Sequence, residues 1–303
     1  MPAESIHLSA LADLRASASS RVTRALATPR AELAARVGVM FVDLPYFHRF
    51  ELGLVRYLLR LPQASSPWGD RFHQRAPIAL GVRLAERGAR LRSQTMTRDV
   101  GDELVALSVG YMSHAAVDTA LHPLVNRLAV DRGARLHTRA FLREHQEVEK
   151  FQSVLFHEAR HGVDYLGTPA LAAHIAIDWR LVETPGLASS VIDEAAHATL
   201  GIAPRRADFA AWAHGYRFFV KMITGPLGRR AVSREDKARE RPGLIEACDY
   251  PGRYAAAVAR SVTWIDALLG YVDDGIFDDS ARSALARTIP EQSLDPAPEP
   301  SPP

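Results

Sequence analysis

The sequence predicts an all-α protein in which many helices form a single domain. Ala, Leu, Arg and Glu dominate the 303 residues, and these residue types favour helices. Stretches in which Val, Ile or Thr alternate with polar residues are rare, so strands are hard to find. Neither an internal repeat nor an internal linker is evident. We therefore expect one multi-helix domain over residues 1–288.

Prolines and glycines mark where the individual helices end. Two long helices are expected over 98–122, ended by Pro123, and over 138–166, ended near Gly167. The Pro-rich segment 289–303 lacks any helical or apolar pattern, so we expect it to be disordered and to stay out of the core. The other expected elements are a helix over 8–28 that stops at Pro29, a helix over 47–60, a loop over 61–72, and shorter helices around 170–181, 188–200, 205–223 and 252–273.

Composition excludes several classes of protein. A single cysteine, Cys248, rules out a disulfide scaffold and a cysteine-based zinc finger. The formal net charge of +2 argues against nucleic acid as an obligate partner. The first residues lack a basic start followed by an apolar run, and no stretch of about 18 apolar residues occurs. We therefore expect a cytoplasmic protein without a secretory signal or a transmembrane segment; the oligomeric state is not indicated.

Histidine is the unusual residue type, with 12 copies and none beyond His214. In the expected helix 98–122, His114 and Asp118 lie four residues apart, so both side chains share one helical face and can reach one cation. His122 continues this series at i+8. The flanking residues are apolar, and buried polar groups must find partners. For this pair alone, a hydrogen-bonded pair in the core is the simpler interpretation.

The same spacing recurs in the next long helix, where His145 and Glu149 are four residues apart. About 15 residues join the two helices, enough to return the chain antiparallel and bring the two polar faces together. Helical bundles build metal sites from facing pairs of this kind, so the repetition favours metal. Three earlier residues are weak signals by themselves: Asp43 in an apolar stretch, His73 at the end of the Pro/Gly loop, and His7 near the start.

Taken in order, these residues resemble the zinc-dependent phospholipase C family. That family includes secreted bacterial phospholipases C and the amino-terminal domain of glycosylphosphatidylinositol-specific phospholipase D, and related single-strand nucleases share its fold. The stretch from Gly110 to Pro123 is most similar to the family's central motif. The resemblance covers about half of the chain and rests on the order His7, Asp43, His73, His114, Asp118, His122, His145 and Glu149.

The resemblance implies an all-α fold that holds two or three zinc ions. One ion would be held by Asp43, His73, His114 and Asp118. A second ion would be held by His145 and Glu149, with His122 either a third ligand or a structural residue. A third ion would be held by His7, the terminal amine and a shared Asp118. Asp43 is also the implied general base. The implied activity is hydrolysis of a small-molecule or lipid phosphodiester, because zinc activates water and neutralises phosphoryl oxygens.

Two other interpretations remain open. Residues 156–161 contain His157, Glu158 and His161 in the H-E-x-x-H spacing of zinc peptidases, with Glu183 or Glu194 as the downstream ligand. The simpler interpretation of that motif is a solvated helix end, with Glu158 in water. The second alternative is a non-enzymatic helical protein whose His and Asp pairs bind a structural metal or each other.

Overall fold

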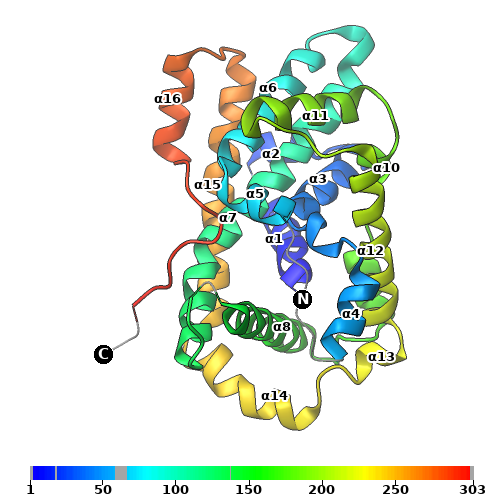
Figure 1. The fold of residues 1–303 in the computed structure, drawn as a ribbon. Helices are drawn as coiled ribbons and strands as arrows, with labels where there is room; N and C mark the ends of the chain where they lie inside the picture. Colours follow the sequence, from blue (N-terminus) through cyan, green and yellow to red (C-terminus); the bar gives the residue numbers. More distant parts are fainter. Residues whose placement is uncertain (1–2, 18, 59–66, 137, 301–303) are drawn as a thin grey trace.

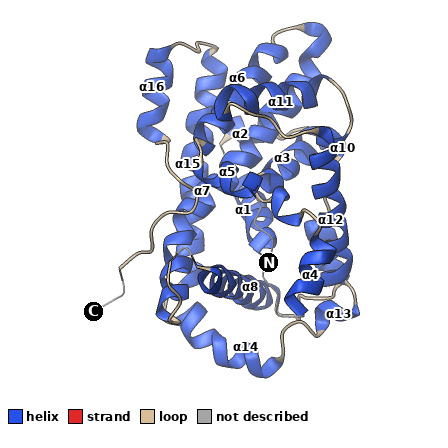
Figure 2. Ribbon diagram, in the orientation of Figure 1, coloured by secondary structure: helices blue, strands red, loops and turns tan. Residues whose placement is uncertain are grey.

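The computed structural model describes residues 3–17, 19–58, 67–136 and 138–300, and every regular element in these ranges is a helix (Figures 1 and 2). The expected all-α fold is therefore confirmed. The long helix α7 (Arg98–Asp131) runs through the molecule, and α3 (Pro29–Phe41), α6 (Pro77–Arg92) and α15 (Tyr250–Asp274) pack along it. One large apolar cluster joins residues from most of the helices, so the core is continuous.

Helix α7 is apolar nearly all round because it is buried nearly all round. Together with the turn before it, Thr95–Asp131 has the length and mean hydropathy of a membrane span, and α15 meets the same criterion. The sequence predicts a helix in each stretch but does not predict that either meets the criterion for a membrane span. In α7, however, 94% of the apolar window is buried inside the protein, against 50% in α15. A central position in the core accounts for the composition of α7.

The expected end of the central helix at Pro123 is wrong, because α7 continues to Asp131. A proline inside a helix lacks the N–H that would bond to the carbonyl four residues earlier, at a cost of about 3 kcal/mol. Around it, Leu121, Leu124 and Val125 are all buried in the core. Burial of three such side chains contributes several kcal/mol, enough to offset the cost.

Helices α3 and α7 cross at two glycines. A Cβ on Gly110 would lie 1.8 Å from the carbonyl oxygen of Ala35, and one on Gly38 would lie 1.9 Å from that of Leu107. Only glycine permits this approach of two backbones. The crossing fixes the C-terminal end of α3, and therefore Asp43 just beyond it, against the middle of α7.

Several other boundaries differ from the sequence prediction. The first expected helix is two helices, α1 (Ala3–Ser17) and α2 (Ser20–Ala25). The expected loop 61–72 ends in α5 (Pro67–Gln74), while 59–66 lie outside the described residues. Helix α8 (Arg139–His161) ends at Gly162, whose φ of +68° suits a C-cap, and not near Gly167. The remaining elements are η1 (Leu44–Phe47), α4 (Phe50–Leu58), η2 (Thr95–Thr97), α9 (Pro169–Ile175), α10 (Arg180–Glu183), α11 (Leu187–Leu200), α12 (Arg206–Thr224), α13 (Pro226–Arg229), α14 (Arg234–Arg241), η3 (Pro242–Glu246) and α16 (Asp279–Thr288).

The Pro-rich segment after α16 differs most from expectation. It forms neither helix nor strand as far as Pro300, but it packs against the protein, and Leu294 is fully buried in the core. The Leu294 N–H donates to the His73 carbonyl at 2.8 Å, and the Glu299 N–H donates to the Pro123 carbonyl at 3.0 Å. Prolines leave few N–H groups to satisfy, so a few bonds to α5 and α7 suffice. Residues 301–303 lie outside the described part.

Candidate metal centre

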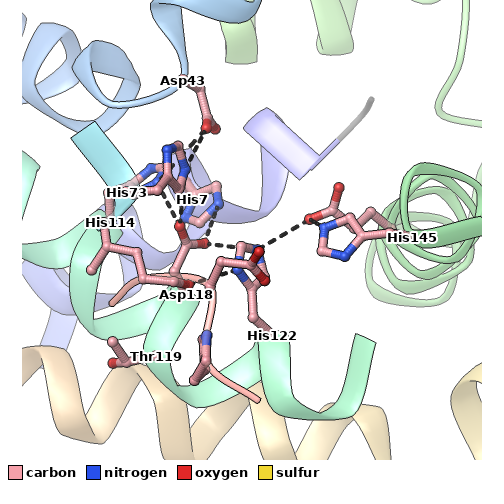
Figure 3. A network of polar contacts seen from close by, with 12 residues as sticks. His7, Asp43, His73, His114, Asp118, Thr119, His122 and His145 are labelled. Atoms are coloured by element: carbon pink, nitrogen blue, oxygen red, sulfur yellow. Dashed lines mark hydrogen bonds and ion pairs between the residues drawn. The ribbon is translucent and has the colours of Figure 1, made fainter. Parts of the chain in front are cut away.

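Eight side chains that the sequence singled out converge between α7, α8 and the N-terminal helices (Figure 3). They come from α1, α5, α7, α8 and the turn after α3, so elements far apart in the chain meet here. The residues are His7, Asp43, His73, His114, Asp118, His122, His145 and Glu149. The structure brings all eight together; their role as metal ligands stays a prediction.

Three groups of side chains could each hold a cation. Within each group one ligand atom per residue lies within 4.8 Å of the others. Two of the groups share His114, which differs from the expected division, in which His114 served one zinc only. They are His7, His114 and Asp118; then Asp43, His73 and His114; and, as a third group, His122, His145 and Glu149.

Asp118 is the hub of the first two groups. Its Oδ2 lies 2.8 Å from Nε2 of His114 and 3.7 Å from Nε2 of His73, and its Oδ1 lies 3.2 Å from Nε2 of His7. The His7 and His114 rings stack with their centroids 3.9 Å apart. Asp43 completes the set, with Oδ1 3.2 Å from Nε2 of His73. A carboxylate shared by several imidazoles is an arrangement that can bridge two cations.

His122 joins this hub to the third group. Its Nε2 lies 3.4 Å from Oδ1 of Asp118 and 3.3 Å from Oε1 of Glu149. On the far side, Nε2 of His145 lies 3.4 Å from the same Glu149 oxygen. Its ring nitrogen faces both carboxylates, and whether His122 is a third ligand or a structural residue stays open.

The opposite nitrogen of three of these rings is held by an oxygen. Nδ1 contacts the Gly69 carbonyl in His73 (2.8 Å), the Leu294 carbonyl in His122 (2.7 Å) and Asn126 Oδ1 in His145 (2.8 Å). An oxygen acceptor requires Nδ1 to carry the proton. In the neutral ring this leaves Nε2 with a free lone pair. The tautomer is thus inferred from the acceptor at Nδ1.

These contacts make the centre suitable for metal. A nitrogen lone pair and a carboxylate oxygen that face each other repel unless a cation lies between them. In tetrahedral zinc sites with bonds of about 2.0–2.1 Å, neighbouring ligand atoms are about 3.3 Å apart. The five contacts of His7, His73, His122 and His145 with their nearest carboxylate oxygens measure 3.2–3.4 Å. Both the spacing and the tautomers therefore fit zinc.

A small cavity of about 20 Å³ lies between the hub and the third group. Asp118, His122 and Glu149 line one side, while Ile6, Val117, Leu121 and Val125 supply apolar walls. This volume accommodates one water molecule or ion. Asp118 and His114 are fully buried in the middle of the centre, whereas the side chains of Asp43 and Glu149 are 17% and 16% exposed. The centre is therefore open to solvent at its two ends.

Without metal, protons take the place of the cation. Burial alone lowers the pKa of His114, but the facing carboxylates Asp118 and Asp43 outweigh it and raise that pKa to about 9. In His122, burial is likewise outweighed by Asp118 and Glu149, which raise its pKa to about 10. Burial favours protonated carboxyls, but the neighbouring imidazoles hold the pKa values of Asp118, Asp43 and Glu149 below their usual range.

Two residues at the centre escaped the sequence analysis. Glu4 lies one helical turn before His7, is 5% exposed, and has an oxygen without a hydrogen-bond partner among the described residues. Burial is the main cause that raises its pKa to about 8, and Asp43 adds to it. The second is Asn126, the Nδ1 partner of His145. Helical spacing could have found both, because Glu4 is three residues from His7 and Asn126 four from His122.

The H-E-x-x-H residues form neither the peptidase site nor the solvated helix end that the sequence suggested. His157 is fully buried, and Glu158 pairs with Lys237 and is not free in water. The rings of His157 and His161 lie parallel with centroids 5.8 Å apart, and neither residue belongs to a metal-suited group in the described ranges. The proposed downstream ligands Glu183 and Glu194 pair with Arg217 and Arg87. The geometry does not favour a peptidase site.

No family model, curated protein or solved structure matches the chain. The fold and the centre therefore define its class by themselves: an all-α protein with buried His, Asp and Glu groups that could bind metal.

Proposed function

We propose that this protein is a zinc-dependent hydrolase of phosphodiesters, similar in fold and centre to the phospholipase C family. The observation that carries the proposal is the set of imidazole Nε2 atoms that face carboxylate oxygens at 3.2–3.4 Å. Three of the rings have Nδ1 held by an oxygen. The order of the ligands along the chain supports the family. The three groups support two or three zinc ions.

Zinc ions in such a centre would lower the pKa of bound water and neutralise charge on the phosphoryl oxygens. The protein's own contribution is position and charge. His7, His73 and His114 present Nε2 around Asp118, and Asp118 stays ionised because His114, His122 and His7 lower its pKa against the effect of burial. The apolar walls lower the local dielectric, which strengthens every charge interaction inside the centre.

Asp43 is the residue we assign to proton transfer. It lies at the solvent-exposed end of the centre, and among the three carboxylates its side chain is the most exposed. His114 and His73 hold its pKa below the usual value against the effect of burial, so the carboxylate is ionised at neutral pH, the form that a general base requires. The substrate we propose is a small-molecule or lipid phosphodiester.

Asp118→Asn tests the proposal. Because Asp118 contacts imidazoles of all three groups, the change should reduce bound zinc and lower hydrolysis of a chromogenic phosphodiester by more than about 100-fold; even outer partners of metal ligands cost about 10–100-fold. The matched control is Asp279→Asn on the exposed face of α16, which should change neither. A purified protein with no bound zinc, or an Asp118→Asn variant with unchanged zinc and activity, would overturn the proposal.

Two alternatives predict different results in the same assays. A zinc peptidase would lose peptide hydrolysis in Glu158→Gln and keep it in Asp118→Asn. A non-enzymatic metal protein would retain zinc in a closed coordination sphere and hydrolyse no phosphodiester. The partly exposed Asp43 and Glu149 favour the enzyme over this last alternative, because they leave the centre accessible.

A further inference from the structure

The C-terminal segment 290–300 is in direct contact with the ligands of the candidate metal centre. It leaves α16 and passes beside α7 (Figure 1). The Leu294 carbonyl accepts from Nδ1 of His122 at 2.7 Å, and the Leu294 N–H donates to the carbonyl of His73 at 2.8 Å. One residue of the segment thus contacts two of the predicted ligands.

Asn126 extends this contact to a third ligand. Its Nδ2 donates to Oδ1 of Asp295 and to the carbonyl of Pro296, both at 2.8 Å. Its Oδ1 faces Nδ1 of His145, also at 2.8 Å. Asn126 is 2% exposed, so these bonds form away from bulk solvent, where lost hydrogen bonds cost most. The amide orientation is set by the network: its oxygen meets a ring N–H, and its nitrogen meets two oxygens.

The third group therefore depends on the segment for the orientation of both of its imidazoles. His122 depends directly on the Leu294 carbonyl, and His145 depends on Asp295 and Pro296 through Asn126. His73 differs, because its Nδ1 is held by Gly69 within α5. In the described residues, Nδ1 of His7 and of His114 has no hydrogen-bond partner. The segment thus supports one group selectively.

The segment is held in place by contacts outside the centre. Glu299 pairs with Arg127 at 3.1 Å and with Arg253 at 2.7 Å. At the other end, Glu291 accepts from the N–H groups of Ile78 and Ala79 at the start of α6. Between these anchors lies the fully buried Leu294. The segment is therefore anchored to the domain at both ends and in its middle.

We propose that Asn126 and residues 294–296 are positioning residues of the third group, and that docking of the C-terminal segment sets the metal affinity of that group. The inference rests on the proposed function as a zinc protein. Linkage makes the effect reciprocal: if docking strengthens metal binding, metal binding strengthens docking by the same factor. A cation at His122, His145 and Glu149 therefore protects the amides of Leu294 and Glu299.

Zinc affinity of full-length variants provides the test, measured by competition with a chromophoric chelator. Glu149→Gln should lose one zinc ion and so identifies the third group. Asn126→Leu should weaken that same ion by about 10–100-fold, the usual effect of removing an outer partner. Added to Glu149→Gln, it should have no further effect. Leu294→Asp, which drives the segment out of the apolar core, should weaken the same ion even if Asn126→Leu fails to fold.

The matched control is Asp279→Asn on the exposed face of α16, which leaves every contact of the segment in place and should leave zinc affinity unchanged. Hydrogen exchange gives a second readout: zinc should slow exchange at Leu294 and Glu299 in the wild type and not in Glu149→Gln. A wild type that binds no zinc would overturn the proposed function itself. Normal zinc affinity in folded Asn126→Leu and Leu294→Asp would overturn the positioning role alone.

Discussion

Asp118 illustrates how the centre balances its charge. Its side chain is 2% exposed, and the carboxylates of Asp43 and Glu149 lie near the same histidines. Three partly or fully buried negative charges require compensation, because an unpaired buried charge costs several kcal/mol. Zinc supplies this charge in the proposed holoprotein. In the metal-free protein, protonated His114 and His122 supply it, and their raised pKa values follow from this need.

Zinc binding should therefore release protons. With metal-free pKa values of about 9 and about 10, His114 and His122 are both protonated at pH 7.5, so zinc should displace about two protons from them. Competition by protons weakens as pH rises through these values. Zinc affinity should thus increase with pH up to about 10 and then level off. Calorimetry in buffers of different ionisation enthalpy measures the number, and zinc binding with no proton release would contradict the assignment.

Sequence spacing alone identifies only some of the candidate ligands. His114 with Asp118, and His145 with Glu149, are visible because helical residues four apart share a face. Asp43, His73 and His7 have no such partner in sequence, and only the family resemblance linked them to the set. The carbonyl of Leu294 could not be predicted at all, since every residue has a carbonyl and only the fold decides which imidazole it meets.

The crossing of α3 and α7 places Asp43 beside the ligands of α7. Gly110→Ala would put a methyl group 1.8 Å from the Ala35 carbonyl oxygen, so the two helices must separate. We expect a loss of about 2 kcal/mol or more in the free energy of unfolding, as for other overpacked cores. Asp43 should move with α3, so zinc affinity should fall as well. Chemical denaturation and zinc titration measure the two effects.

Gly243→Ala provides the control for this change. A Cβ there meets nothing within 4 Å, and its backbone is not left-handed. The variant should match the wild type in both stability and zinc affinity. If Gly110→Ala also matched the wild type, the close crossing would not be what positions Asp43.

Single elements were predictable where local signals agree with packing, and not elsewhere. The helices 188–200 and 205–223 match α11 and α12 closely, because apolar periodicity and flanking Gly or Pro coincide. The predicted helix end at Pro123 is wrong because the buried residues around the proline stabilise the helix more than the proline destabilises it. The start of α5 was assigned to a loop because Pro67 and Gly69 are turn residues in isolation. Gly69 leaves room for the ring of Tyr46, which would lie 2.4 Å from a Cβ.

Across the whole molecule, the centre brings together parts of the chain that are far apart in sequence. Helices α1, α5, α7 and α8 and the turn after α3 contribute predicted ligands, and the C-terminal segment supports two of them from more than 140 residues away. A metal ion held by these side chains would cross-link elements from residue 7 to residue 149, and the C-terminal segment would join them through its bonds to His122 and Asn126. The fold and the ion are then mutually dependent.

Removal of zinc should consequently destabilise the entire domain and not only the centre. A ligand present at about 100 times its Kd contributes about 2.7 kcal/mol to the free energy of unfolding, so chelation should lower Tm by several degrees. Differential scanning calorimetry with and without a chelator measures this. Glu149→Gln, which lacks the third group, should show a smaller shift than the wild type but not zero, since the groups around Asp118 remain. An identical Tm with and without chelator would mean that no ion links these elements.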